Sequence, residues 1–465
     1  MIRIDRALTP ADLSRSIDRL FELSAAKIQS LERSWNAASG APVFTVEGRY
    51  ASRGWTEWTE GFQYGSALLQ FDATGDREFL DLGRERTLTR MAPHLTHVGV
   101  HDHGFNNVST YGGLWRLALE GRFDASEWEV RFYALALKVS GAVQARRWTP
   151  LADGGFIYSF NGAHSLFVDT IRSLRALALS HVLGHRLVDE QDRQVNLLTR
   201  LVQHARATAA FNVFYGKTTG PFDVRGRVAH ESLFNAANGT YRGPSTQQGY
   251  SPFSTWTRGL AWAMLGFAEQ LEFLATLLPE TQRDAGADDV EPVLLDAARA
   301  TCDYYIDSAA CADGVPYWDT GAPGLSAVDD WATRPSDPFN DREPVDSSAA
   351  AIAAQGLLRL GHFLDARGGD GARYTQAGLQ VLKTLFDESG PYLSRDPEHQ
   401  GLILHSVYHW PNGWDHVPPG ARTPRGESCQ WGDYHAREAA LYVKRLAEGQ
   451  RYLAFYGPGG RAALP

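Results

Sequence analysis

Two aspartates have surroundings that suit acid–base chemistry, Asp102 and Asp169. Asp102 lies between two histidines in the run His101-Asp-His103. Asp169 follows the apolar run 166–168, and further apolar residues come after it at helical spacing. Burial disfavours the charged form of a carboxyl group, so we expect a raised pKa for Asp169 and a proton held near neutral pH. A carboxyl group in that state can act as a general acid, and the sequence predicts Asp169 and Asp102 as a catalytic pair.

Each aspartate also has a structural interpretation. An Asp at the start of a helix is a common N-cap, and both residues precede predicted helices. Asp169 has in addition Arg172 three residues further on, at the spacing of an ion pair on one helix face. These alternatives remain open from the sequence.

Other kinds of active site have little support in this chain. The two His-x3-His pairs, 181/185 and 405/409, fall at a helix end and in a loop, so neither predicts a helical metal-ligand pair. There is no Gly-x-Ser-x-Gly elbow and no Gly-rich phosphate loop. We therefore expect no metal and no cofactor. Paired carboxylates among aromatic residues are typical of glycoside chemistry, where one group protonates and the other activates water or stabilises charge.

Short clusters of aromatic and polar residues provide candidate sugar contacts. The chain has 13 Trp, 18 Tyr and 22 Phe, and aromatic rings can stack on sugars or simply pack in the core. Trp256 and Arg258 combine a stacking face with a fork-shaped carboxylate binder within one turn. His230 and Gln247-Gln248 belong to a long loop, where polar residues are either functional or merely solvated. Trp58 is equally compatible with a core position.

Twelve segments with helical periodicity must position these clusters. The predicted helices are 12–35, 55–71, 76–91, 105–120, 126–145, 165–183, 189–210, 255–275, 290–309, 347–366, 373–388 and 430–446, with ends uncertain by about 2 to 4 residues. Odd-numbered helices are amphipathic. Even-numbered helices are rich in Ala, Gly, Leu and Trp, and the polar and aromatic clusters stand at their starts.

This alternation predicts an all-α fold, an (α/α)6 barrel, because inner helices must pack on both sides while outer helices have one solvated face. We expect one catalytic domain over residues 1–465, with the six clusters around one pocket. Long loops at about 211–253, 310–345 and 395–428 are predicted to lie near that pocket. A short hairpin is expected inside the first of them.

Composition and charge exclude several classes of partner. Acidic residues outnumber basic ones, 54 to 45, and no Lys/Arg-rich run occurs, so we expect no nucleic-acid partner. No apolar stretch is long enough to span a bilayer. Three cysteines, an odd number without metal-ligand spacing, favour a reducing compartment. We expect a cytoplasmic protein, or a periplasmic one if a signal sequence has been removed, and a monomer or homodimer.

Seven short motifs, in order along most of the chain, resemble glycoside hydrolase family 88, the unsaturated glucuronyl hydrolases, and more distantly family 105. The motifs are Trp58-x-x-Gly61-Phe62, His101-Asp-x-Gly-Phe105, Val168-Asp169, His230 with Gln248-Gly-Tyr250, Ser254-Thr-Trp-x-Arg-Gly259-x-Ala-Trp262, Asp346-Ser-Ser-Ala349 and Trp431-Gly-Asp-Tyr434. Any one of them is weak, but their shared order is specific.

The resemblance implies an (α/α)6 barrel and removal of an unsaturated uronic acid from the non-reducing end of lyase-generated acidic oligosaccharides. The reaction is hydration of the C4=C5 enol ether, after which the glycosidic bond breaks by rearrangement. By resemblance Asp169 is the general acid and Asp102 holds the sugar hydroxyls. The residues that match substrate-binding positions are Trp58, His101, Phe160, His230, Gln247, Gln248, Trp256, Arg258 and Ser428.

Three departures from the family pattern concern specificity. Gln247 stands where the family usually has His, and Phe160 where it often has Trp. The aromatic segment 405–415 is longer than expected and predicts a distinct aglycone site. Two alternatives stay open: another carbohydrate reaction on the same barrel, such as hydrolysis of saturated glucuronides or a lyase or epimerase reaction, and a uronide-binding protein without activity.

Overall fold

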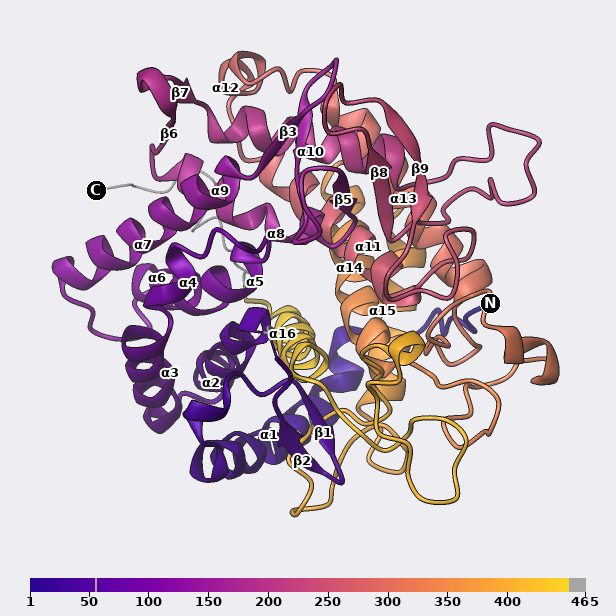
Figure 1. The fold of residues 1–465 in the computed structure, drawn as a ribbon. Coiled ribbons are helices and arrows are strands. Elements are labelled where there is room, and N and C mark those ends of the chain that lie inside the picture. Colours follow the sequence, from indigo (N-terminus) through magenta and orange to yellow (C-terminus); the bar gives the residue numbers. More distant parts are fainter. Residues whose placement is uncertain (55–56, 451–465) are drawn as a thin grey trace.

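The computed structural model describes residues 1–54 and 57–450, and its helices form two concentric rings (Figure 1). Trp55 and Thr56, at the start of the second predicted helix, lie outside the described residues. In the described part of the chain the inner ring consists of α2 (Glu60–Thr74), α5 (His103–Asn107) with α6 (Gly113–Leu119), α8 (Thr170–Ser173) with α9 (Arg175–Val182), α11 (Thr257–Leu274), α14 (Ser347–Ala366) and α16 (Gln430–Ala447). Each inner helix packs on the next, and α16 packs on α2, which closes the ring.

The outer ring covers the inner one. It consists of α1 (Ser14–Ser34), α3 (Arg77–Arg90), α7 (Glu127–Arg146), α10 (Leu197–Phe211), α13 (Val290–Tyr304) and α15 (Ala372–Leu385), with the short helices α4 (Ala92–Leu95) and α12 (Pro279–Asp284) in connections. All but the last two residues of α14 are buried apart from one half-buried His, whereas α1 buries one face only. The predicted (α/α)6 barrel and its alternation of inner and outer helices are confirmed.

Glycines let the starts of neighbouring inner helices approach closely. A Cβ atom at Gly104 of α5 would lie 2.4 Å from the carbonyl oxygen of Ser173 in α8. A Cβ atom at Gly61 of α2 would lie 2.4 Å from the Cα of Asn106 in α5. Only glycine fits at such distances, so these residues of the Gly-Phe motifs determine how close the inner helices stand.

Three predicted helices are interrupted. The fourth contains a π-helical turn at Val108–Gly112 between α5 and α6. The sixth begins as a strand, β5 (Ser165–Phe167), and breaks at Leu174 between α8 and α9. The start predicted for the seventh forms a hairpin instead, β6 (Leu187–Val188) with β7 (Gln194–Val195). Short apolar runs suit a buried strand as well as a helix, so periodicity alone misassigned these segments.

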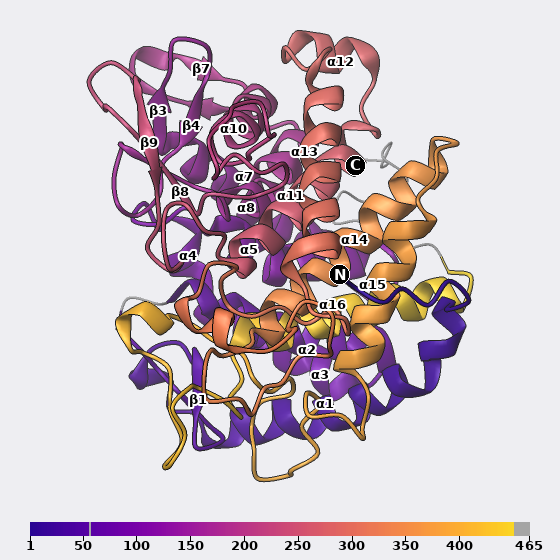
Figure 2. The same cartoon turned by 90° about the vertical axis from the view of Figure 1, so that its right-hand side faces the viewer.

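Small antiparallel sheets gather at one end of the barrel. They are β1 (Phe44–Val46) with β2 (Arg49–Ala51), β3 (Trp148–Pro150) with β4 (Gly155–Ile157), and a three-stranded sheet in the order β5, β8 (Glu231–Phe234), β9 (Tyr241–Ser245). The β8–β9 pair is the hairpin expected within 211–253. Figure 2 shows β1, β3, β8 and β9 on the same side of the molecule, at the end seen in Figure 1.

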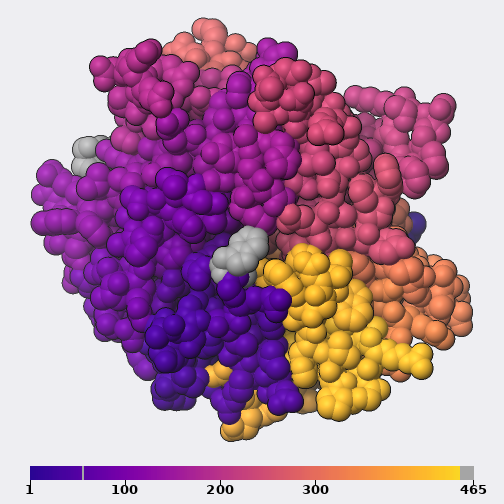
Figure 3. Space-filling model, in the orientation of Figure 1, coloured from indigo at the N-terminus to yellow at the C-terminus, as the bar shows by residue number. Residues whose placement is uncertain are grey.

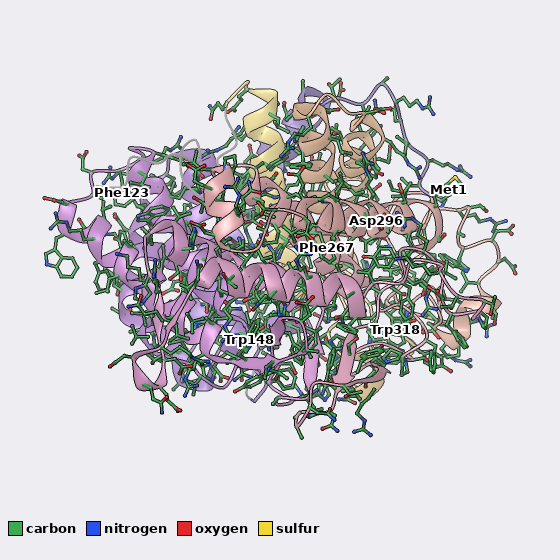
Figure 4. The ribbon with its side chains drawn as sticks, turned by 90° about the horizontal axis from the view of Figure 1, so that it is seen from above. Met1, Phe123, Trp148, Phe267, Asp296 and Trp318 are labelled. Carbon is green, nitrogen blue, oxygen red and sulfur yellow. The ribbon has the colours of Figure 1, made fainter. Side chains whose placement is uncertain are left out.

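Segments that lie far apart in the sequence meet at this face. In Figure 3 the indigo N-terminal, magenta central and yellow C-terminal parts come together near its centre. From above, Phe267 of α11 lies in the interior, while Phe123 and Met1 lie at opposite sides (Figure 4). Phe267 is fully buried. No helix in the described part of the chain is long and apolar enough to cross a membrane.

Candidate active site

A cavity of about 370 Å³ opens where the inner helices α5, α8 and α11 begin. Its volume lies in the range of small-molecule sites. The described residues that line it are Trp58, Val100, His101, Asp102, Phe105, Phe160, Asn161, Phe167, Asp169, Gln247, Gln248, Trp256, Arg258, Trp262, Tyr408, His409, Asn412 and Trp414.

One imidazole nitrogen joins the two predicted catalytic aspartates. Nε2 of His101 lies 3.1 Å from Oδ1 of Asp169 and 3.7 Å from Oδ1 of Asp102. All three side chains are buried. Although they come from positions far apart in sequence, the starts of α5 and α8 bring them to one point. We refer to these three residues as the proton-sharing trio.

The capping interpretation does not describe these aspartates. Asp102 and Asp169 occupy the N-cap positions of α5 and α8, yet neither side chain makes a capping hydrogen bond. The proposed partner of Asp169, Arg172, instead pairs with Glu269 and Glu438. Both carboxylates are therefore available to the cavity.

The trio has two carboxyl groups and only one imidazole to balance their negative charge. Burial raises the pKa of Asp102 to about 6, because the attraction of His101 only partly offsets desolvation and the repulsion from Asp169. Burial alone would lower the pKa of His101, but Asp102 and Asp169 outweigh it, and the pKa lies above its ordinary value. The raised pKa favours the imidazolium form of His101, which lies between the two carboxyl groups.

The expected raised pKa of Asp169 is wrong. Its carboxyl group is buried as predicted, and burial raises the pKa, but the hydrogen bond from His101 and the charge of His101 lower it further than burial raises it. The raised value belongs to Asp102. The sequence showed the apolar run before Asp169 but not the imidazole that folds against it.

A buried arginine holds the loops that carry the trio and its aromatic neighbour. Arg147 follows α7 and donates to the carbonyl oxygens of Val98, Tyr158 and Ser159. Phe160, on the second of these loops, stacks on His101 with ring centres 6.0 Å apart. Phe160 therefore places an apolar face beside the imidazole, and it also lines the cavity.

The three-stranded sheet positions the second half of the site. The backbone N–H of Val168, just after β5, donates to the carbonyl of His230, just before β8, at 2.9 Å. Nδ1 of His230 accepts from the N–H groups of Gln247 and Gln248 at 3.0 and 3.3 Å. This nitrogen is therefore unprotonated, which places the ring hydrogen on Nε2. Burial lowers the pKa of His230 to about 4.

His230 stands behind the cavity wall. Its ring packs between Phe167 and Trp256, with ring centres 4.5 and 4.6 Å away, and the cavity lining does not include it. Gln247, Gln248 and Trp256 do line the cavity. The sequence predicted that His230 contacts the substrate. In this structure it instead supports the residues that face the cavity.

Arg258 reaches the cavity but its guanidinium is occupied. It donates to Asp346 at 2.8 Å, to Gln248 at 2.8 Å, to the carbonyl of Tyr408 at 2.7 Å, and to the carbonyl of Val407. Its ring neighbours are Trp256 and Trp431. The predicted fork for a substrate carboxylate is therefore directed into the protein, because four acceptors already use its terminal N–H groups.

The aromatic segment 405–415 supplies the outer wall. Tyr408, His409, Asn412 and Trp414 line the cavity, and Trp58 donates to the Tyr408 hydroxyl at 3.4 Å. The sequence singled out this segment by its length and aromatic content but none of its residues individually. It gave no signal for Val100 or Asn161, and it named Phe167 and Trp262 only within a run and a motif, because their contribution to the lining depends on the closing of the barrel.

Two sequence expectations are not met at the cavity wall. Ser428 lies elsewhere: its hydroxyl donates to the carbonyl of Ile403, and its N–H donates to the hydroxyl of Thr45 in β1. Among the described residues, none of the lining comes from loop 310–345. That loop instead supports the start of α11, where the N–H of Thr257 donates to the carbonyl of Trp318 at 3.0 Å.

The described residues contain no cluster of three or more His, Cys, Asp and Glu side chains arranged to hold a metal ion. The site consists of a proton-sharing carboxylate pair within aromatic walls at the axis of an (α/α)6 barrel. This combination is that of a glycoside hydrolase.

Curated relatives and solved structures agree with this class. The chain is 28% identical over 410 residues to an unsaturated glucuronyl hydrolase of Bacillus sp. (strain GL1), covering 85% of this chain and 89% of the relative. It is 23% identical over 397 residues to an unsaturated chondroitin disaccharide hydrolase of Streptococcus agalactiae, covering 83% and 81%. No family model matches the chain.

The fold is shared with solved enzymes. The crystal structure of the Bacillus sp. GL1 unsaturated glucuronyl hydrolase superposes with a TM-score of 0.67 at 23% identity, covering 92% of this chain and 95% of that one. An unsaturated glucuronyl hydrolase specific for heparin superposes with a TM-score of 0.70 at 18% identity, covering 94% and 98%. Over most of its length the chain is therefore similar to unsaturated glucuronyl hydrolases, in agreement with the resemblance of its motifs to glycoside hydrolase family 88.

Proposed function

We propose that this protein removes the unsaturated uronic acid from the non-reducing end of acidic oligosaccharides by hydrating its C4=C5 bond. The observation that carries the proposal is the proton-sharing trio of His101, Asp102 and Asp169 in an aromatic cavity. An enol ether needs a proton at one carbon and then water at the adjacent carbon. The trio can supply that proton, and it can then accept the proton that the water releases.

Asp169 is the proposed proton donor to C4. In the free enzyme the shared proton lies on His101, 3.1 Å from Asp169. When a sugar replaces the water in the cavity, the lower polarity favours the neutral imidazole and neutral carboxylic acid over the ion pair. The proton then moves to Asp169 and can be delivered to carbon.

Hydration restores the starting state of the acid. As C4 takes the proton, positive charge develops at C5 and on the ring oxygen. Water adds at C5, and its released proton returns to the Asp169 carboxylate. The product is a hemiketal that opens without further catalysis and releases the rest of the oligosaccharide. Asp102, with its pKa of about 6, is placed to hold sugar hydroxyl groups beside Asp169.

Aromatic and amide groups complete the proposed binding site. Trp58, Phe160 and Trp256 offer faces for the sugar rings, and Gln247 and Gln248 offer hydrogen bonds. The charge of Arg258 favours an anionic ring nearby even though its terminal N–H groups are used within the protein. The parent polysaccharide is not part of this proposal.

We also propose a cytoplasmic monomer or homodimer. Cys302, Cys311 and Cys429 are buried free thiols, which suits a reducing compartment. Cell fractionation and light scattering test these two points separately from the activity.

The test of the reaction follows both the double bond and the new C–H bond. Wild-type protein is incubated in D2O with lyase-generated unsaturated disaccharides, while ultraviolet absorbance and the mass of the released acid are recorded. We expect absorbance to disappear and deuterium to appear at C4. Release of a uronic acid that keeps its double bond, or turnover of saturated glucuronides only, contradicts the proposal.

Two aspartate variants separate chemistry from folding. Asp169→Asn is expected to lower kcat/KM by about 10³-fold or more, because the proton donor is lost. Asp76→Asn makes the same chemical change at the N-cap of α3, where the side chain does cap the helix at the N–H of Glu78. This control should keep wild-type activity, and full activity of Asp169→Asn rules out its role as the acid.

A further inference from the structure

The cavity has a buried base and an open rim. Asp169 and His101 at the base are 8% and 1% exposed, whereas Asn412 on the outer wall is exposed and Trp414 is half-buried. If the proposed function holds, C4 and C5 of the uronic acid must reach Asp169 at the base. The next sugar then points toward solvent and passes the segment that carries Asn412 and Trp414.

This segment is a closed loop, which we call the rim loop, residues Tyr408 to Trp414. Gly413 has a left-handed backbone with φ of +62°, and its N–H donates to the carbonyl of Trp410 at 2.9 Å. The rings of His409 and Trp414 have centres 4.7 Å apart. Apart from these turns, the rim loop has no strand or long helix of its own to hold it.

The ends of the rim loop are gripped by one carboxylate. Oδ1 of Asp415 accepts the N–H of Tyr408, and Oδ2 accepts the N–H of His409 at 2.9 Å. From the other side, Arg258 donates to the carbonyl oxygens of Val407 and Tyr408. The backbone at the start of the rim loop is therefore held between a guanidinium on its carbonyl groups and a carboxylate on its N–H groups.

We propose that Asp415 is a positioning residue that fixes the rim loop against the sugar adjoining the unsaturated uronic acid. It does not reach the cavity lining itself and acts through the backbone of Tyr408 and His409. The rim loop presents aromatic and amide groups, and Arg53 lies over the outer ring of Trp414 at 4.0 Å. Such a wall suits a sugar ring that offers an apolar face for stacking.

The inference rests on the proposed function, and the experiment separates the two. Two substrates are compared: an unsaturated uronic acid linked to a sugar, and the same acid linked to methanol. Asp415→Ala removes both acceptors and Asp415→Asn removes one. We expect KM for the disaccharide to rise about tenfold in Asp415→Ala and less in Asp415→Asn, with kcat and all constants for the methyl glycoside within about twofold of wild type.

The chain contains a matched control. Asp223 grips another loop in the same way, with Oδ1 accepting the N–H of Gly216 at 2.9 Å and Oδ2 that of Thr218 at 2.6 Å. That loop does not line the cavity, so Asp223→Ala should leave both substrates unaffected. Trp414→Ala removes a wall residue without touching the clamp and should reproduce the selective rise in KM, which keeps the test available if Asp415→Ala does not fold.

Each outcome is decisive. If wild type processes neither substrate, the proposed function fails and the positioning role fails with it. If wild type processes both and Asp415→Ala lowers both equally, Asp415 supports the catalytic trio or the fold rather than the rim loop. Wild-type constants for a folded Asp415→Ala on both substrates also overturn the inference.

Discussion

Two groups of buried charges within the inner ring of helices behave in opposite ways. The proton-sharing trio lies at the starts of α5 and α8. Deeper in the barrel, an axial ion cluster joins four inner helices and consists of Arg172, Arg175, Glu269, Arg359 and Glu438. Arg172 pairs with Glu269 and, at 2.7 Å, with Glu438. The trio and the cluster both hold two carboxylates out of water.

The difference lies in charge compensation. In the axial ion cluster three guanidiniums surround the two carboxylates. Burial would raise the pKa of Glu438, but Arg172 and Arg175 outweigh it and the pKa falls to about 2. In the trio two carboxylates share one imidazole, and the pKa of Asp102 rises to about 6. A compensated carboxylate stays ionised and holds helices together, whereas an undercompensated one exchanges protons near neutral pH.

The largest effect is expected from breaking the axial ion cluster. Glu438→Gln removes one of the two carboxylates that compensate three buried guanidiniums, which should lower the free energy of unfolding by about 3 to 5 kcal/mol. Chemical denaturation measures this change. Glu448→Gln makes the same chemical change at an exposed position just after α16 and provides the control. A loss below about 1 kcal/mol contradicts the structural role of the cluster.

The opposite change in stability is expected at the trio. Asp102 has a folded-state pKa of about 6 against an unfolded value near 3.9, so the native state binds the extra proton between these values. Stability therefore falls as pH rises from about 4 to 6, and ionised Asp102 costs about 2 to 3 kcal/mol above pH 6. Asp102→Asn should be more stable than wild type at pH 8 by about this amount, and the gain should vanish near pH 4. Denaturation at both pH values measures it, and a gain that is independent of pH speaks against the shared-proton interpretation.

A smaller effect is expected in the pH dependence of activity. The wild-type kcat/KM should fall as pH rises through the pKa of His101, which its two carboxylate neighbours raise, because His101 then loses the proton that it passes to Asp169. Asp102→Asn removes one of these negative charges, so the pKa of His101 falls and the loss of activity should move to lower pH by about one unit. The rate profile from pH 4 to 9 measures the shift. An upward shift is inconsistent with the electrostatics of the trio.

The smallest effect is expected at Ser428. Its hydroxyl bonds to the carbonyl of Ile403 rather than facing the cavity. Ser428→Ala should keep kcat and KM for unsaturated disaccharides within about twofold of wild type while costing about 1 kcal/mol of stability. A rise in KM with unchanged stability reverses this placement and returns Ser428 to the substrate site.

The local pattern of the sequence determined most of the helices and the architecture of this protein. Helical periodicity and small-residue content are properties of neighbouring residues, so the twelve helices, their inner and outer alternation and the clusters at the inner starts were readable from the chain. The pairing of Asp102 and Asp169 in one cavity followed from that architecture. The motifs that resemble family 88 led to the same class.

Only the tertiary structure decided which groups meet those residues. The apolar run 165–167 is a strand because β8 pairs with it, and periodicity cannot distinguish the two over three residues. Arg258 is occupied because Asp346 and the 407–408 carbonyls reach it from far along the chain. In the free protein the raised pKa values are those of Asp102 and His101, and the pKa of Asp169 is lowered. The sequence could not show this, because pKa values depend on distances of a few ångströms between residues that lie far apart in the sequence.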